Sequence, residues 1–246
     1  MKAFDQDIGR LREYLAQKRE AGRKVRRLDS GEGKKQAGFS TGGKPAIVLR
    51  EDAWVELGNP GTASLAVVLL TESLELVHDG AISLVGPDIP QARGKLPFAQ
   101  VLLVGSSQLK DEDYRKLNSA QYELDLRGYM IKSLPSELSI WSRASRDSVG
   151  DGLSLGVVGK ALGAGLKSRF DLQSLEVIFV TSSEDDVREL GDISRKARRI
   201  LGAMNKMMEE LSFDCSTCEY SDVCSEVVEL KKMRRELMKS RRGNGR

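Results

Sequence analysis

Three cysteines within ten residues are the side chains with the clearest potential for chemistry. Cys215, Cys218 and Cys224 follow the pattern C-x2-C-x5-C. Two thiolates separated by two residues can face one ion from a tight turn, and the third can return from the start of the next predicted helix, whose positive end favours thiolate. Three thiolates suit an iron–sulfur cluster with one open corner, or a Zn²⁺ site with a fourth ligand from elsewhere. The alternative is three unligated cysteines, or one disulfide, in a turn between helices.

Other catalytic patterns do not rise above background. The one histidine, His78, leaves little room for general-base chemistry. Gly156, Gly159, Gly163 and Gly165 form neither a dinucleotide-binding fingerprint nor a P-loop. We interpret these glycines as sites where a helix packs closely against a sheet.

The net charge of +3 conceals an uneven distribution. Residues 18–44 contain nine Lys/Arg and three acids, residues 231–246 contain eight and one, and the stretch between them has a net charge of −10. An acidic body with basic ends favours an anionic partner or a solvated tail, and it disfavours nucleic-acid binding, for which aromatic stacking platforms are also scarce. No apolar run reaches the roughly 18 residues of a membrane span, and the N-terminus has no apolar signal core, so we expect a cytoplasmic protein.

Strands and helices must position the cysteines, and hydrophobic patterning predicts both. Short apolar runs bounded by turn residues predict buried strands at 46–49, 65–70, 81–85, 98–104 and 175–180, with 177–180 in the interior of a sheet. A helix is the alternative at 65–70. Helical spacing and capping signals predict helices at 4–19, 111–127, 153–170, 185–211 and 225–240. This pattern predicts an α/β (or α+β) fold with a mixed sheet covered by helices.

The predicted domain organisation has four parts. An N-terminal helix at 1–20 is followed by a flexible basic linker at 21–44, because that stretch is rich in Gly, Lys and Ser and has little to bury. The α/β domain occupies 45–211. The cysteine loop and a basic C-terminal helix occupy 212–246, so that two helices flank the loop.

Several short blocks, in order along the chain, resemble the acetyl-CoA synthase (beta) subunit family of the CO dehydrogenase/acetyl-CoA synthase complex. Each block is short, but their shared order extends over residues 54–224. The blocks are V-E-L-G-N-P at 55–60, I-S-L-V-G-P-D-I at 82–89, P-F-A at 97–99, G-Y-M at 128–130, W-S-R-A-S-R-D at 141–147 and the strand V-I-F-V-T at 177–181, followed by the cysteine loop.

The resemblance implies a metal centre but not the complete one. The family's active site is a nickel centre bridged to a [4Fe–4S] cluster, with cluster cysteines spaced C-x2-C-x8-C-x9-C and a later Cys-Gly-Cys motif. Cys215 and Cys218 match the opening pair, Cys224 matches the third with a shortened spacing, and Cys-Gly-Cys is absent. Because thiolates are the soft ligands that such a site needs, we do not expect this chain alone to be active. The expected cofactor is an iron–sulfur cluster, [4Fe–4S], with an open or non-cysteine fourth corner.

The resemblance also implies a CoA-handling region around the W-S-R-A-S-R-D block. Trp141 would stack on the adenine, and Arg143 and Arg146 would contact the phosphates. The alternative is that Trp141 anchors the core and Arg143 is its paired neighbour. The expected partners are subunits of the complex or its corrinoid protein. The competing hypothesis is a non-enzymatic scaffold with structural Zn²⁺ or no metal.

Overall fold

The computed structural model describes residues 3–22, 25–28, 53–109, 111–209 and 219–224, together with Lys232 and Arg235. The strands are β1 (Val25–Arg27), β2 (Trp54–Leu57), β3 (Ser64–Thr71), β4 (Ile82–Val85), β5 (Lys95–Leu96), β6 (Phe98–Gly105), β7 (Tyr129–Leu134), β8 (Ser139–Ser145) and β9 (Ser174–Val180). The helices are α1 (Asp5–Glu20), α2 (Asp111–Ala120), α3 (Arg146–Gly150), α4 (Leu155–Arg169), α5 (Glu184–Ile193), α6 (Arg195–Glu209) and α7 (Ser221–Cys224), and the short 3-10 helices are η2 (Leu74–Leu76), η3 (Ile89–Gln91) and η4 (Pro135–Glu137).

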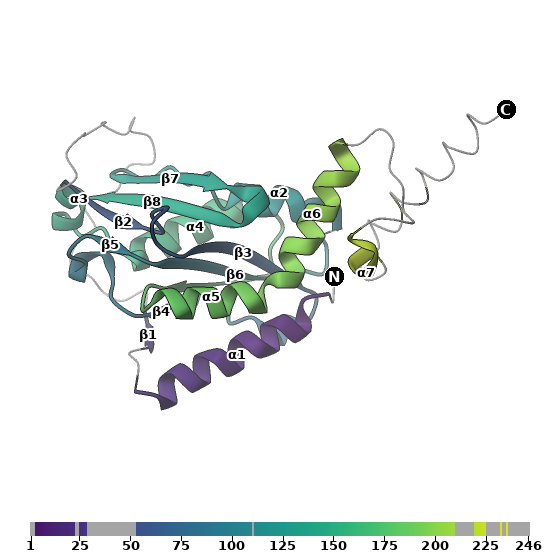
Figure 1. Ribbon diagram of the computed structural model, residues 1–246, viewed down its shortest axis with the longest axis horizontal. Coiled ribbons are helices and arrows are strands. Elements are labelled where there is room, and N and C mark those ends of the chain that lie inside the picture. The colour runs from purple at the N-terminus through teal and green to yellow at the C-terminus, as the bar shows by residue number, and fades with distance from the viewer. Residues whose placement is uncertain are drawn as a thin grey trace.

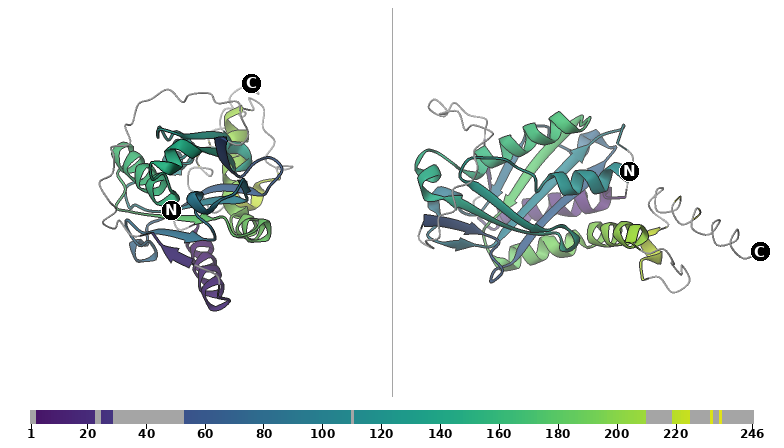
Figure 2. Two further views of the ribbon diagram at one scale, coloured as in Figure 1. Left: turned by 90° about the vertical axis from the view of Figure 1, so that its left-hand side faces the viewer. Right: turned by 90° about the horizontal axis from the view of Figure 1, so that it is seen from above.

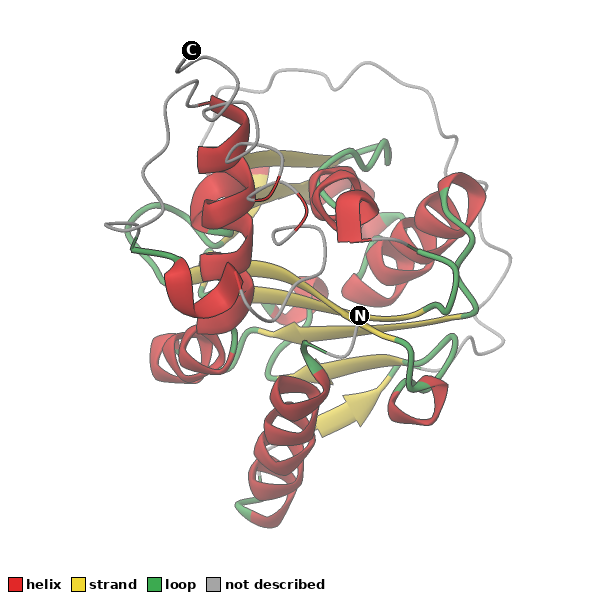
Figure 3. Cartoon of the chain, turned by 90° about the vertical axis from the view of Figure 1, so that its right-hand side faces the viewer, coloured by secondary structure: helices red, strands yellow, loops and turns green. Residues whose placement is uncertain are grey.

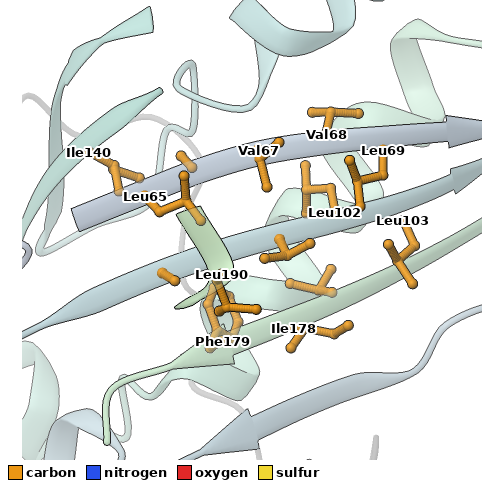
Figure 4. Packing of buried hydrophobic residues seen from close by; sticks show 14 of the residues in the cluster. Leu65, Val67, Val68, Leu69, Leu102, Leu103, Ile140, Ile178, Phe179 and Leu190 are labelled. Carbon is orange, nitrogen blue, oxygen red and sulfur yellow. The ribbon is translucent and has the colours of Figure 1, made fainter. Parts of the chain in front are cut away.

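The larger sheet has five strands in the order β1-β4-β9-β6-β3 and mixes parallel with antiparallel pairs. All residues of β6 and β9 are buried, which is the pattern of strands covered on both faces. The prediction that 177–180 lies in an interior strand is confirmed, because β9 pairs with β4 on one side and with β6 on the other. Figure 4 shows aliphatic side chains from β3, β6 and β9, with Phe179, forming this core.

Helices cover both faces of the five-stranded sheet. Figures 1 and 3 show α1 and α5 on one side of it and α4 on the other. The apolar stripe of α1 (Phe4, Ile8, Leu11 and Leu15) is fully part of the core. Gly159 of α4 confirms the helix-packing interpretation of the glycines at that position, because an added Cβ would lie only 3.1 Å from Ile82.

A second, four-stranded sheet has the order β5-β2-β8-β7, and sequence analysis did not predict it. Its strands carry many serines and charged residues, so the apolar runs that identify the larger sheet are missing. Along β8, burial alternates strictly: Ile140, Ser142 and Ala144 are buried, and the residues between them are half-buried. This alternation is typical of a sheet with one face packed and one face more open. Figure 2 shows this sheet beside the larger one, and the backbone N–H of Ala66 in β3 donates to the carbonyl of Leu138, just before β8, at 2.7 Å.

The predicted mixed α/β fold is confirmed, and two predicted helices are shorter than expected. The predicted helix 185–211 is divided into α5 and α6 at Ser194, where the backbone leaves the helical region at φ −89° and ψ 7°. An unbroken helix over 185–211 would extend about 40 Å, beyond the roughly 26 Å of an eight-residue strand beneath it, so a change of direction lets α6 stay in contact with the body. The helix predicted at 111–127 ends at Ala120, because the next residues turn inward and Tyr122 donates to the carbonyl of Ala66 at 3.3 Å.

Three predictions involve residues that the structure does not fully describe. The strand predicted at 46–49 lies outside the described residues. So does the helix predicted at 225–240, apart from the isolated Lys232 and Arg235. Most of the predicted linker at 21–44 also lies outside them. Within it, Val25–Arg27 is an edge strand that pairs antiparallel with β4. In the described part of the chain, no helix is long and apolar enough to cross a membrane.

Candidate functional site

Trp141 and Arg143 lie on the open face of the four-stranded sheet. Both belong to β8 and are two residues apart, so the strand's alternation directs them to the same face, away from buried Ser142. The guanidinium carbon of Arg143 is 4.5 Å from the centre of the Trp141 ring, and the ammonium of Lys132 on β7 is 5.0 Å from it. The structure therefore brings two of the three predicted CoA-contacting residues together, with a lysine that the sequence analysis did not single out.

Glu56 holds Arg143 in place from the neighbouring strand. It lies directly opposite Arg143 in the β2–β8 pairing, and its Oε1 accepts from Arg143 Nε at 2.9 Å and lies 2.8 Å from Nη2. The side chain of Asn59 donates to the other carboxylate oxygen. Arg143 is thus oriented and largely neutralised by an acid within the protein, which is the paired arrangement expected if Trp141 and Arg143 are structural.

The indole N–H of Trp141 is a buried donor without a hydrogen-bond partner in the described part of the chain. A buried donor left without an acceptor costs about 1–3 kcal/mol. Lys95 on β5, opposite Glu56 in register, adds another exposed cation to this face. The face therefore combines an aromatic ring and an unsatisfied donor with three cations and one acid.

Arg146 occupies a different position from the other two residues of its block. It is the first residue of α3, beyond the end of β8, and its side chain is exposed. The cap of this helix is Ser145, whose hydroxyl accepts from the backbone N–H of Ser148 at 3.4 Å. The cluster on the sheet is formed by β2, β7 and β8, and Arg146 lies next to it in sequence.

The third cysteine is the part of the predicted metal site that the structure describes. Cys224 is the fourth residue of α7, which begins at Ser221, and it is only 4 % exposed. Cys215 and Cys218 lie outside the described residues, and among the described residues no group of three metal-ligating side chains occurs. Cys224 belongs to the hydrophobic core cluster, and apolar burial disfavours a thiolate unless the charge of a metal compensates it.

Contacts between α6 and α7 fix the position of Cys224. Arg199 of α6 forms two hydrogen bonds to the carboxylate of Asp222, at 2.6 and 3.1 Å, and a third to the carbonyl of Glu219 at 2.6 Å. The hydrogen bonds between the two side chains raise the pKa of Arg199 and lower the pKa of Asp222. Tyr220 packs on Gly202 so closely that an added Cβ would lie 2.9 Å from its hydroxyl. The two described segments that flank residues 210–218 in the sequence, α6 and α7, are therefore in contact.

Two glycines and one aspartate in the blocks that resemble the family have structural roles. Gly58 has φ +65°, and a Cβ there would lie 2.3 Å from the carbonyl oxygen of Ile140. Gly86 has φ +111°, and a Cβ would lie 2.6 Å from the backbone nitrogen of Ser182. Asp88 is buried and accepts from the backbone N–H groups of Ile89 at 2.7 Å and Leu155 at 2.8 Å, which joins β4 to the start of α4. These blocks therefore specify the junctions between elements.

Glu56, the partner of Arg143, was not singled out by the sequence analysis. It belongs to the V-E-L-G-N-P block, so the block marked the position, but nothing in the local sequence indicated that it pairs with a residue 87 positions away. Lys132 was missed for the same reason, since only the β7–β8 register places it opposite Trp141.

The comparison with known families agrees with the resemblance. The family model of the CO dehydrogenase/acetyl-CoA synthase complex beta subunit matches residues 40–186. The match includes Glu56, Trp141, Arg143 and Arg146, and it ends before the cysteine loop. No curated protein matches the chain. Because the match extends over more than half of the sequence, the chain belongs to the CO dehydrogenase/acetyl-CoA synthase complex beta subunit family.

Proposed function

We propose that this protein is a cytoplasmic accessory or partial subunit of a CO dehydrogenase/acetyl-CoA synthase complex, in anaerobic one-carbon and acetyl-CoA metabolism. The observation that carries the proposal is the position of the family match. It falls on the sheet-forming body, and the matched residues contain none of the three cysteines. The chain has the family's scaffold and too few thiolates for a complete nickel–iron–sulfur site, so it acts with other subunits or the corrinoid protein of the complex and not alone.

More specifically, we propose that Cys215, Cys218 and Cys224 bind an iron–sulfur cluster. Its support is the C-x2-C-x5-C spacing, together with the contacts between α6 and α7 that fix the position of Cys224. When bound, the cluster would supply a redox-active or structural centre next to the body. Asp214, Glu219 or a second subunit is the candidate source of a fourth ligand.

Anaerobic reconstitution tests the cluster. Iron and sulfide should be measured, with visible spectra, in the wild type, in Cys218→Ser and in a control from the same loop, Ser216→Ala. We expect about four iron atoms per chain in the wild type and the control, and a large loss in Cys218→Ser. Equal iron in all three samples would exclude the cluster. Stoichiometric zinc, or no metal at all, would instead support the scaffold hypothesis.

We also propose that CoA contacts the open face of the four-stranded sheet. Trp141 offers a ring and an unsatisfied N–H donor, and Arg143, Lys132 and Lys95 offer positive charge. Glu56 already neutralises much of Arg143, and its own charge repels phosphate. The contribution of Arg143 to CoA affinity should therefore lie near the lower end of the usual 1–3 kcal/mol for a charge-assisted contact.

Calorimetry with CoA tests this contact. Arg143→Ala should weaken binding about fivefold, which corresponds to roughly 1 kcal/mol. Trp141→Phe keeps an aromatic ring and removes the indole donor, so it separates stacking from hydrogen bonding. Arg188→Ala is the matched control, because Arg188 is an exposed arginine with acidic partners on α5. Unchanged CoA affinity in Arg143→Ala and Trp141→Phe, with circular dichroism showing intact folds, would remove the CoA contact while leaving the family assignment in place.

A further inference from the structure

A pocket of about 410 Å³ opens at the end of the molecule where α2 and α6 lie, apart from the open face of the four-stranded sheet. Figure 1 shows these two helices at the same end of the body. Residues of α2, of the C-terminal end of α4, of η4 and of α6 line the pocket. Its volume is in the range of small-molecule sites. Neither Trp141 nor the α6–α7 contact contributes to its walls.

The charged residues of the pocket wall are mainly cations. Arg115, Lys116 and Arg169 line it against one acid, Glu123. Arg169 is paired with Glu123 at 2.6 Å, and Lys116 lies 3.4 Å from the carboxylate of Asp113. Arg115 has no hydrogen-bond or ion-pair partner within the described part of the chain. One guanidinium at the pocket is therefore available to an anion.

A chain of buried amides ends at the pocket with a free donor. Gln100 in the middle of β6 donates to Gln121 Oε1 at 3.3 Å, and Gln121 donates to Asn118 Oδ1 at 2.9 Å. Asn118 is 2 % exposed and lines the pocket, and no residue that the structure describes accepts a hydrogen bond from its Nδ2. In the structure each amide accepts through its oxygen from the one before it, so the amide nitrogen of Asn118 is the group left at the end of the chain. The group presented to the pocket is therefore an N–H donor that has no acceptor among the described residues.

The apolar part of the lining consists mainly of Phe170, Leu201 and Pro135. Ala120, Ser119 and Asn205 complete the wall. We propose that this pocket binds a small amphipathic organic anion, with a carboxylate or phosphate head group at Arg115 and Asn118 and an apolar body against Phe170, Leu201 and Pro135. Two independent features support the same ligand chemistry, namely the unpaired cation of Arg115 and the unpaired amide donor of Asn118.

Residue-resolved NMR titration of the full chain tests the proposal with three probes. Hexanoate has both a charged head and an apolar body, hexanol has only the body, and inorganic phosphate has only a head. We expect hexanoate to cause saturable shifts of the side-chain amides of Asn118 and Asn205, which both line the pocket. Hexanol and phosphate should each bind at least about fivefold more weakly. Arg115→Gln should weaken hexanoate three- to tenfold.

Asn118→Asp is the most informative variant. The new carboxylate still accepts from Gln121, so the amide chain keeps its geometry, but the donor is replaced by a negative charge. Hexanoate affinity should fall more than tenfold, while the exposed-arginine control Arg188→Gln leaves it unchanged. Arg115 is exposed, so the Arg115→Gln protein should fold even if Asn118→Asp does not. The proposal is overturned if hexanoate causes no saturable shift at Asn118, if phosphate saturates and hexanoate does not, or if folded Arg115→Gln binds as tightly as the wild type.

Discussion

The ion pair between Arg12 and Glu176 should make a large contribution to stability because its acid is almost completely buried. Arg12, on α1, donates to both carboxylate oxygens of Glu176 on the central strand β9, at 2.7 and 2.5 Å, and also to the carbonyl of Leu76 at 2.7 Å. The backbone N–H of His78 supplies a further hydrogen bond to Glu176 at 3.0 Å. The side chain of Glu176 is 2 % exposed and that of Arg12 is 27 % exposed.

Arg12→Met keeps most of the apolar stem and removes the guanidinium. Breaking a buried pair costs about 3–5 kcal/mol, because the remaining charge has no compensation. Partial exposure of Arg12 and the retained bond from His78 favour the lower end, so we expect a loss of about 3 kcal/mol. Arg12→Met/Glu176→Gln should recover at least about 1 kcal/mol of that loss, because the buried group is then neutral. Lys167→Met is the control: its pair with Asp79 is well exposed on both sides and should contribute below about 1 kcal/mol.

Urea unfolding followed by circular dichroism measures these differences at one pH and salt concentration. The order of stability should be wild type, then Lys167→Met, then the double variant, then Arg12→Met. If Arg12→Met costs no more than Lys167→Met, or if the double variant is no more stable than Arg12→Met, an uncompensated buried carboxylate is not the source of the loss. The docking of α1 on β9 would then depend on its apolar stripe alone.

Two further predictions concern backbone space and pH. Gly58→Ala should lower the free energy of unfolding by more than about 2 kcal/mol, because φ is +65° and the new Cβ would lie 2.3 Å from a carbonyl oxygen. Gly80→Ala, at φ +71° with open space around the new Cβ, should lower it by only about 1 kcal/mol. Equal losses for the two variants in urea unfolding would contradict the steric argument. Burial of Asp186 opposes its ionisation, but hydrogen bonds from Lys18 and two serines outweigh burial and lower the pKa of Asp186 below 3.8. Its contribution to stability is therefore complete above pH 3.8 and disappears as pH falls through the lower folded-state value, so Asp186→Asn should flatten the acid limb of stability against pH, and an unchanged limb would refute this linkage.

The family assignment and the larger sheet followed from local sequence. Residues 65–70, 98–104 and 175–180 are apolar runs interrupted only by Gln100 and Glu176, and short runs of this kind bounded by turn residues favour strands covered on both faces. The helices at 4–19 and 153–170 were predicted because their apolar positions repeat with the helical period. The blocks that identified the family could be recognised for a related reason. The geometry of one junction between elements requires each of Gly58, Gly86 and Asp88, so a short segment of sequence is enough to show the requirement.

Only the tertiary structure decided which distant residues meet. Glu56 pairs with Arg143, and Arg12 pairs with Glu176 across 164 positions, because strand register and helix docking place them together. The four-stranded sheet was not predicted, since its strands are half-exposed and do not form apolar runs. The amide chain from Gln100 to Asn118 depends on how α2 sits on the sheet. Periodicity and turn chemistry are local and can be read along the chain, whereas ion pairs and pockets depend on packing between segments, which becomes definite only when the whole core assembles.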